Sequence, residues 1–111
     1  MEEIYSQKQL DQKILTYFRG GWSQDDTYKI LRDFYNVYDY VKLTRAYVRQ
    51  KFKELKQDNT EFEIRKANMR YIREQKISKK SRFIGLQVRL GIIKTTDPDF
   101  KAILEGYGDG D

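Results

Sequence analysis

The sequence predicts a small all-α domain. In our interpretation an N-terminal three-helix unit of helix-turn-helix type is followed by a basic fourth helix and an apolar C-terminal element. The chain has 111 residues, the length of one domain. Its apolar residues, 39% of the total, recur mostly at helical spacing. The only proline, Pro98, leaves residues 1–97 without the strongest helix breaker.

The first predicted helix begins at Ser6 and stops at Gly20 and Gly21. Ser6 and Gln9 have the spacing of a capping box. Glycine adopts the left-handed backbone that ends helices without a steric penalty. The apolar stripe of this helix consists of Leu10, Ile14, Tyr17 and Phe18.

The second predicted helix follows Trp22, with Ser23 as its N-cap. Asp25 and Asp26 then lie in the first turn, where the helix dipole favours negative charge. Trp22 could offer a stacking surface to a base, but we expect it to anchor the core. The inner face of the helix consists of Thr27, Ile30, Phe34 and Val37.

Residues 36–43 are predicted to be a turn or a loose extension of the second helix. A third helix follows, capped at either Asp39 or Thr44, and runs to about Leu55.

The polar residues 56–59 are expected to interrupt the helical pattern. Thr60 and Glu63 then have the spacing of a second capping box, which predicts a fourth helix to about Gln75. A continuous helix over residues 44–75 is the main alternative.

Residues 83–93 fit two periodicities. The alternation of apolar and polar residues from Ile84 to Ile92 is typical of a strand. Helical spacing instead gathers Phe83, Leu86, Leu90 and Ile93 on one face of a helix capped by Ser81. We favour the helix, because a lone strand would have no partner in a helical chain.

These elements predict three parts in sequence order. Residues 1–58 form the helix-turn-helix-like unit, and residues 59–104 hold the basic helix and an apolar assembly element. Asp97 or Thr96 is expected to cap a last helical turn through Leu104. Residues 105–111 form a flexible acidic tail.

The charges are distributed unevenly. Residues 1–64 carry eleven basic and eleven acidic side chains. Residues 65–94 carry ten basic side chains against Glu74 alone, and residues 95–111 are acidic overall. This asymmetry predicts a polyanionic partner for the basic segment. A solvated helix face followed by a linker would produce the same pattern.

The third helix has a polar face with the properties of a DNA-reading surface. Arginine can bond guanine bidentately and glutamine can do the same for adenine, while lysine reaches phosphates. Ala46 keeps this face slim enough to approach a major groove ~12 Å wide. The predicted DNA-contacting residues here are Lys42, Arg45, Arg49, Gln50 and Lys53.

The fourth helix carries a straight basic stripe, because Lys66, Arg70 and Arg73 lie at positions i, i+4 and i+7. Together with Lys79, Lys80 and Arg82 it could follow a phosphate backbone. A membrane surface fits less well, since the opposite face lacks a broad leucine and phenylalanine surface.

The composition argues against catalysis. There is neither histidine nor cysteine, which removes the commonest general base, thiolate zinc sites and disulfides. There is no glycine-rich phosphate loop. The clustered carboxylates are best explained by a helix start (Asp25 and Asp26) and by a solubilising acidic tail. The tail group consists of Asp97, Asp99, Asp109 and Asp111. We therefore expect a protein without enzymatic activity, cofactor or metal.

The sequence also predicts a cytoplasmic location. The N-terminus has neither the basic flank nor the apolar run of a signal peptide. No apolar stretch approaches the ~18 residues of a membrane span. The cytoplasm would be that of a host cell if the protein is viral.

Five segments follow one another in an order that is found in a known protein family. Residues 14–20 and 22–31 precede the helix at 43–55, and the basic 70–76 precedes the apolar 82–93. This order resembles the small terminase subunits of tailed bacteriophages, which join a helix-turn-helix unit to helical oligomerisation elements that build a ring. It is almost equally similar to small phage transcription regulators with sigma-factor-like DNA-binding domains.

The terminase resemblance implies recognition of a packaging site on double-stranded DNA and delivery of that DNA to a large ATP-driven subunit. It also implies a homo-oligomer with an assembly surface formed by Phe83, Leu86, Leu90 and Ile93. The alternatives are a transcription regulator, whose partner would be the transcription machinery, and a non-enzymatic assembly protein that binds a protein partner. No aromatic surface for single-stranded nucleic acid is predicted.

Overall fold

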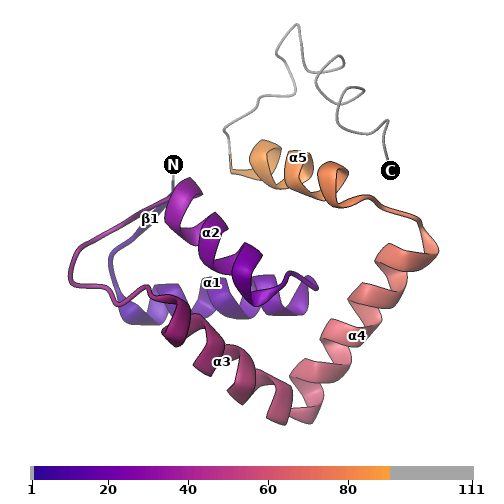
Figure 1. The fold of residues 1–111 in the computed structure, drawn as a ribbon, viewed down its shortest axis with the longest axis horizontal. Helices are drawn as coiled ribbons and strands as arrows, with labels where there is room; N and C mark the ends of the chain where they lie inside the picture. The colour runs from indigo at the N-terminus through magenta and orange to yellow at the C-terminus, as the bar shows by residue number, and fades with distance from the viewer. Residues whose placement is uncertain (1, 91–111) are drawn as a thin grey trace, which may run out of the picture. The chain divides into compact units, whose positions relative to one another are not determined.

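The computed structural model describes residues 2–90, in which five helices and two short strands follow one another (Figure 1). The prediction of a mainly helical protein is confirmed. The chain divides into a compact unit of residues 2–71 and a second unit that begins at Ile72. The elements are β1 (Glu2–Ile4), α1 (Gln7–Arg19), α2 (Gln24–Phe34), β2 (Tyr35–Val37), α3 (Arg45–Gln57), α4 (Asn59–Glu74) and α5 (Lys79–Arg89).

Helix α1 begins and ends where the sequence predicts. The Ser6 hydroxyl accepts a hydrogen bond from the Gln9 amide at 3.1 Å. The Gln9 side chain accepts in turn from the backbone amide of Tyr5, one residue before the cap. At the other end, Gly21 has a φ of 84°, the left-handed backbone that glycine adopts without a steric penalty.

Helix α2 is capped by Ser23, as predicted. The Ser23 hydroxyl accepts a hydrogen bond from the Asp26 amide at 3.1 Å. Thr27 and Ile30 are buried on its inner face. The prediction for the next residues was wrong. The backbone becomes extended at Tyr35 and forms β2. Val37 therefore belongs to a strand and not to the inner face of α2.

The two strands make a small parallel sheet, with Glu2 opposite Tyr35 and Ile4 opposite Val37. Ile4 and Tyr35 are buried, and the Tyr38 amide extends the ladder by donating to the Ile4 carbonyl at 3.0 Å. The sequence did not predict this sheet, because three residues are too few to establish a period of two.

Helix α3 begins after Thr44, whose hydroxyl accepts from the Tyr47 amide, so Thr44 and not Asp39 is the cap. The helix ends at Asp58, which excludes a continuous helix over residues 44–75. The Asp58 carboxylate accepts from the amides of Thr60 and Glu61. Asp58 therefore starts α4, and the predicted cap at Thr60 was two residues too late.

Helix α5 resolves the ambiguity of residues 83–93 in favour of a helix over the part that is described. The hydroxyl of Ser78 accepts from the Ser81 amide at 3.0 Å, so the helix starts at Ser78 and not at Ser81. Ile93, the predicted last turn through Leu104 and the acidic tail lie outside the described residues.

The core of the 2–71 unit lies between α1, α2 and α3, which contact one another pairwise (Figure 1). Phe18 and Phe52 meet edge to face at 5.2 Å between ring centroids. Trp22 is 7% exposed, so the prediction that it anchors the core is confirmed. Each fully buried side chain of this size stabilises the fold by about 1.5 to 3 kcal/mol. This core fixes α3, and it thereby determines which face of α3 remains exposed.

Candidate nucleic-acid interface

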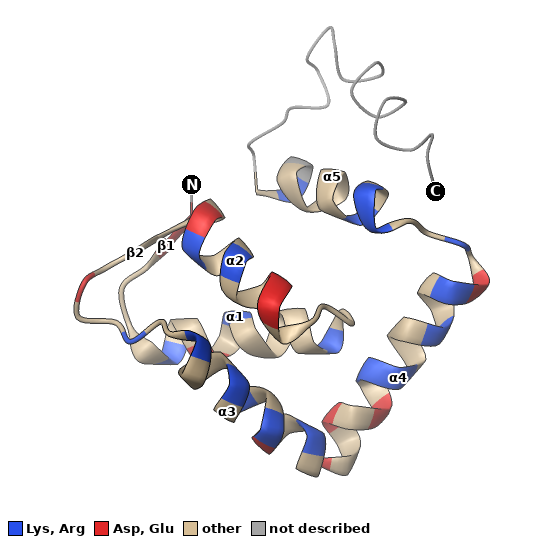
Figure 2. Cartoon of the chain, viewed as in Figure 1, with Lys and Arg blue, Asp and Glu red and all other residues tan. Residues whose placement is uncertain are grey.

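Helix α3 presents a polar face because its apolar stripe is held in the core. Val48 and Phe52 are each 1% exposed. At 100° per residue, Arg49, Gln50 and Lys53 lie away from that stripe, and all three are exposed. Ala46 is exposed on the same side. These positions supply arginine, lysine and an amide, and basic residues recur along α3 (Figure 2). The exposed Glu54 borders the face, and the Gln50 side-chain amide donates to its carboxylate at 3.5 Å.

Lys42 occupies a different place from the one that the helical pattern predicted. It precedes α3 in the connection from β2, so its expected position on the helix was wrong. Its backbone is held by the Gln7 side chain, which accepts from the Lys42 amide at 2.9 Å and donates to the Lys42 carbonyl at 3.2 Å. The amine of Lys42 therefore extends from a fixed point before the start of α3.

Arg45 is exposed but already has partners within the chain. Its guanidinium forms an ion pair with the Asp25 carboxylate and lies over the Tyr28 ring, 4.7 Å from the centroid. Lys29 contacts the same carboxylate at 2.9 Å. The hydrogen bond from Lys29, followed by that from Arg45, lowers the pKa of Asp25 to about 2.

A hollow of about 220 Å³ lies between the start of α2 and α3. Its lining combines one carboxylate with two guanidinium groups, an amide and a phenol. The lining residues are Gln24, Asp25, Tyr28, Arg45 and Arg49.

The flank of α3 that faces α1 is internally neutralised. The Tyr47 hydroxyl donates to the Asp11 carboxylate, and burial, followed by this bond, raises the pKa of Tyr47. Lys51 lies 3.6 Å from Asp11 and 3.6 Å from Glu54. Lys51 is thus engaged by one acid of α1 and one of α3, in contrast to Lys53.

Helix α4 has no buried side chain, and polar contacts fix it to the end of α1. The guanidinium of Arg19 donates twice to the Glu61 carboxylate, at 2.6 and 2.5 Å. The Glu61 side chain is only 14% exposed. The hydrogen bond from Arg19 lowers the pKa of Glu61 below its ordinary value.

Arg65 and Asn68 continue this contact one and two turns further along α4. The Arg65 guanidinium donates to the carbonyls of Phe18 at 2.7 Å and Trp22 at 2.9 Å. The Asn68 amide donates to the Arg19 carbonyl at 2.7 Å. The carbonyls of Phe18 and Arg19 belong to the last turn of α1, where carbonyls have no partner inside the helix, and the Trp22 carbonyl lies in the turn that follows. The sequence pattern indicates Arg65 only as one cation of the basic segment.

The predicted basic stripe of α4 lies on an exposed face of the helix. Lys66, Arg70 and Arg73 are all exposed, and Lys66 pairs with Glu63 at 2.7 Å. Figure 2 shows basic residues along both α3 and α4. Lys66 and Arg70 belong to the same compact unit as the face of α3.

The remaining predicted site residues lie in α5, within the second unit. Lys79 and Lys80 are exposed, whereas Arg82 is half-buried. Of the predicted assembly residues, Leu86 is buried and Phe83 and Leu90 are half-buried.

An aromatic surface that the sequence pattern does not predict lies beside the sheet. The Tyr38 ring meets the Tyr5 ring edge to face, 6.5 Å between centroids, and the Tyr40 ring at a tilt of 43°, 6.0 Å between centroids. The three side chains are between 40 and 71% exposed. The pairing of β1 with β2 brings Tyr5 next to Tyr38, and nothing in the spacing along the chain indicates it.

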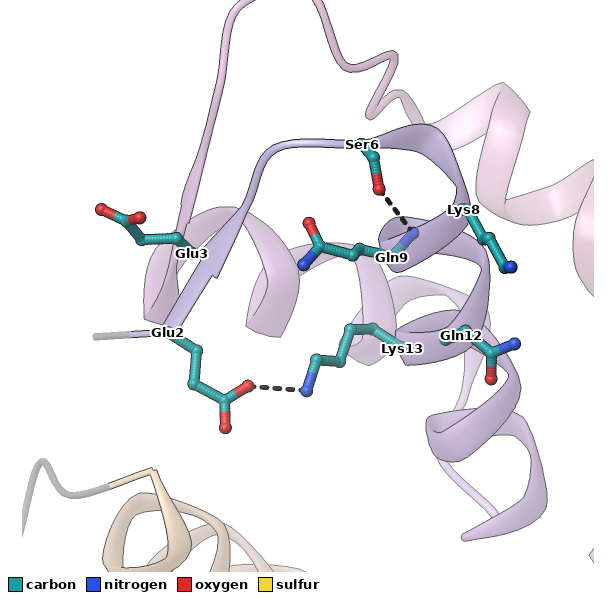
Figure 3. Close-up of a pocket in the computed structure, with 7 residues that line it drawn as sticks. All are labelled: Glu2, Glu3, Ser6, Lys8, Gln9, Gln12 and Lys13. Atoms are coloured by element: carbon teal, nitrogen blue, oxygen red, sulfur yellow. Dashed lines mark hydrogen bonds and ion pairs between the residues drawn. The ribbon is translucent and has the colours of Figure 1, made fainter.

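A larger hollow, of about 480 Å³, lies at the start of α1 (Figure 3). Lys13 is turned toward Glu2, 2.6 Å away. The two acids and two bases of the lining balance, so its charge does not favour a polyanion. The lining residues are Glu2, Glu3, Ser6, Lys8, Gln9, Gln12 and Lys13. Among residues 2–90 no group of acidic side chains is arranged to hold a metal ion.

Comparison with protein-family models, curated proteins and solved structures gave no match to this chain. The resemblance to small terminase subunits therefore stays a prediction. Within the described part of the chain, no helix combines the length and the apolar character needed to cross a membrane.

Proposed function

We propose that this chain is a non-enzymatic protein that binds duplex DNA. In this proposal, the outer face of α3 reads base edges in the major groove. The exposed cations of α4 contact the phosphate backbone.

The observation that carries the proposal is the exposed run of Arg49, Gln50 and Lys53 on a helix anchored from behind by Phe52. Arginine and glutamine are the side chains best suited to bidentate bonds with guanine and adenine. A helix held by a buried stripe offers them from a rigid base, which base reading needs.

Helix α4 supports the proposal with sequence-independent contacts. Lys66 and Arg70 lie one turn apart and are exposed, while Arg65 holds the helix against α1. Each phosphate that such cations neutralise releases counterions, so binding would weaken steeply with salt.

The first test is fluorescence anisotropy of labelled random duplex DNA between roughly 50 and 200 mM salt, followed by selection of a preferred sequence. We expect affinity to fall steeply across this range. An absence of binding at 50 mM salt would overturn the proposal and favour a protein that binds a protein partner.

The second test compares two sets of variants on the selected sequence. Arg49→Ala together with Gln50→Ala should lose about 2 to 4 kcal/mol of specific binding, at about 1 to 3 per base contact. Lys51→Ala is the matched control, because Lys51 lies on the same helix but faces Asp11 and Glu54. Equal losses in both sets would remove the outer face of α3 from the interface.

Within this function, viral DNA packaging is the role that the terminase resemblance implies, and transcription control is the alternative. Packaging would require a homo-oligomer and a large ATPase as partner. Light scattering after size-exclusion chromatography tests the first requirement, and a monomer at high protein concentration would exclude a ring.

A further inference from the structure

The proposed DNA face has an acid at its edge that engages one of its cations. The Asp25 carboxylate forms an ion pair with the Arg45 guanidinium, although the two residues come from different helices. Figure 2 shows acidic residues at both ends of α2 and basic residues along α3.

Two contacts hold Arg45 in this position, and a third holds its partner Asp25. The carboxylate of Asp25 pairs with it, the Tyr28 ring lies under it, and Lys29 holds the same carboxylate from one helical turn further on. Because the pKa of Asp25 is about 2, its carboxylate is ionised throughout the neutral range. Arg45 therefore has to leave a fully charged partner before it can bond a phosphate.

We propose that Asp25 restrains Arg45 and thereby weakens binding of the chain to DNA of any sequence. The inference rests on the proposed function. Arg45 lines the same hollow as Arg49, at the edge of the base-reading face. Once Arg49 and Gln50 have formed hydrogen bonds with the correct bases, a backbone phosphate competes with Asp25 for Arg45. On other sequences that phosphate is less well positioned, and Arg45 stays with Asp25.

Such a restraint increases the ratio of specific to non-specific DNA affinity, although Asp25 and Arg45 themselves contact no base. Phosphate bonds form with every sequence, so a cation that is freely available raises specific and non-specific affinity equally. A carboxylate that occupies one cation lowers the non-specific part of the affinity.

The chain offers a matched control on the same helix. Asp33 is also an exposed carboxylate of α2 paired with an arginine, Arg32, at 2.8 Å. It lies eight residues from Asp25, about 12 Å along the helix axis. At 0.1 M salt this separation exceeds the screening length of ~10 Å, so the charge of Asp33 should have little effect on a phosphate that lies beside Asp25.

The experiment measures random-duplex affinity of the full chain with Asp25→Asn or Asp33→Asn. Both substitutions raise the net charge by one. We expect Asp25→Asn to bind about three to ten times more tightly and Asp33→Asn to stay within about twofold of the wild type. The salt dependence should also steepen by about one unit in Asp25→Asn, because one more cation reaches a phosphate.

The Arg45→Ala background separates release of Arg45 from a simple change in net charge. Release of Arg45 predicts that most of the gain from Asp25→Asn is lost once Arg45 is absent, because only Lys29 then remains to be freed. An undiminished gain there, or equal affinities for Asp25→Asn and Asp33→Asn, would overturn the inference. Circular dichroism of each variant checks that the helices are retained.

The failure of the inference can be distinguished from that of the proposed function. If the wild type binds DNA and loses affinity with Arg49→Ala, while Asp25→Asn changes nothing, only the restraint is wrong. If neither the wild type nor any variant binds at roughly 50 mM salt, the proposed function is wrong and the restraint falls with it.

Discussion

Helices α3 and α4 look alike in sequence but are held in opposite ways. Both are rich in lysine and arginine, and one residue, Asp58, separates them. Val48 and Phe52 anchor α3 in the apolar core. Helix α4 has no buried side chain and is held by polar contacts to the end of α1.

The positions of lysine and arginine in the sequence do not by themselves reveal which cations are available to a partner. Arg65 satisfies backbone carbonyls, Lys51 faces two acids, and Arg45 pairs with Asp25. Arg49, Lys53 and Arg70 are exposed cations of the same type. Only the packing of the helices separates these two groups.

The largest expected effect comes from the anchor of α3. Phe52→Ala should reduce the free energy of unfolding by about 3 to 5 kcal/mol, because it leaves a cavity beside Phe18. Urea denaturation measures this loss. Phe62→Ala is the control on α4, where the ring is half-buried, and should cost no more than about 1 kcal/mol. Similar losses of unfolding free energy in both variants would mean that α4 is also anchored by apolar packing.

A smaller effect is expected for the polar anchor of α4. Arg65→Ala removes two hydrogen bonds from a charged donor to backbone carbonyls and should cost about 2 to 3 kcal/mol. Lys66→Ala, one residue further on and exposed, should change stability by less than about 0.5 kcal/mol. Hydrogen exchange of the α4 amides provides the measurement. Unchanged protection in Arg65→Ala would mean that other contacts hold this helix.

The smallest effect is expected from pH near neutrality. The chain has no histidine, so we expect its melting temperature to be constant between about pH 5 and 7. Asp25 and Glu61 have folded-state pKa values below their ordinary ones. Their stabilisation is therefore complete above about pH 4 to 5 and is lost as pH falls through the folded values, toward about 2 for Asp25.

Melting temperatures measured across pH test this expectation. Glu61→Gln should reduce the acid dependence, because Glu61 holds α4 through Arg19. A shift of several degrees between pH 5 and 7 would contradict the prediction.

Much of the fold could be predicted because its signals are local. Ser6 and Ser23 cap the first two helices through amides three residues away, and Gly21 ends α1 with a left-handed backbone. Two predicted helix caps were wrong because a nearby polar side chain accepts the hydrogen bonds from the first free amides instead. Asp58 caps α4 in place of Thr60, and Ser78 caps α5 in place of Ser81.

The candidate site was only partly predictable. The exposed face of Arg49, Gln50 and Lys53 follows from helical periodicity alone. The engagement of Arg45 by Asp25 could not be predicted in this way, because it joins two helices. The position of Lys42 also depended on a distant side chain, the amide of Gln7.

The sequence by itself determined where helices begin, which stripe of each is apolar and where positive charge accumulates, since these depend on neighbours within about four residues. Tertiary structure decided the pairing of β1 with β2, the clustering of Tyr5 with Tyr38 and the use of Arg65 as a helix cap. These contacts join residues 30 or more positions apart. A side chain's partner at that distance depends on how the core orients each helix.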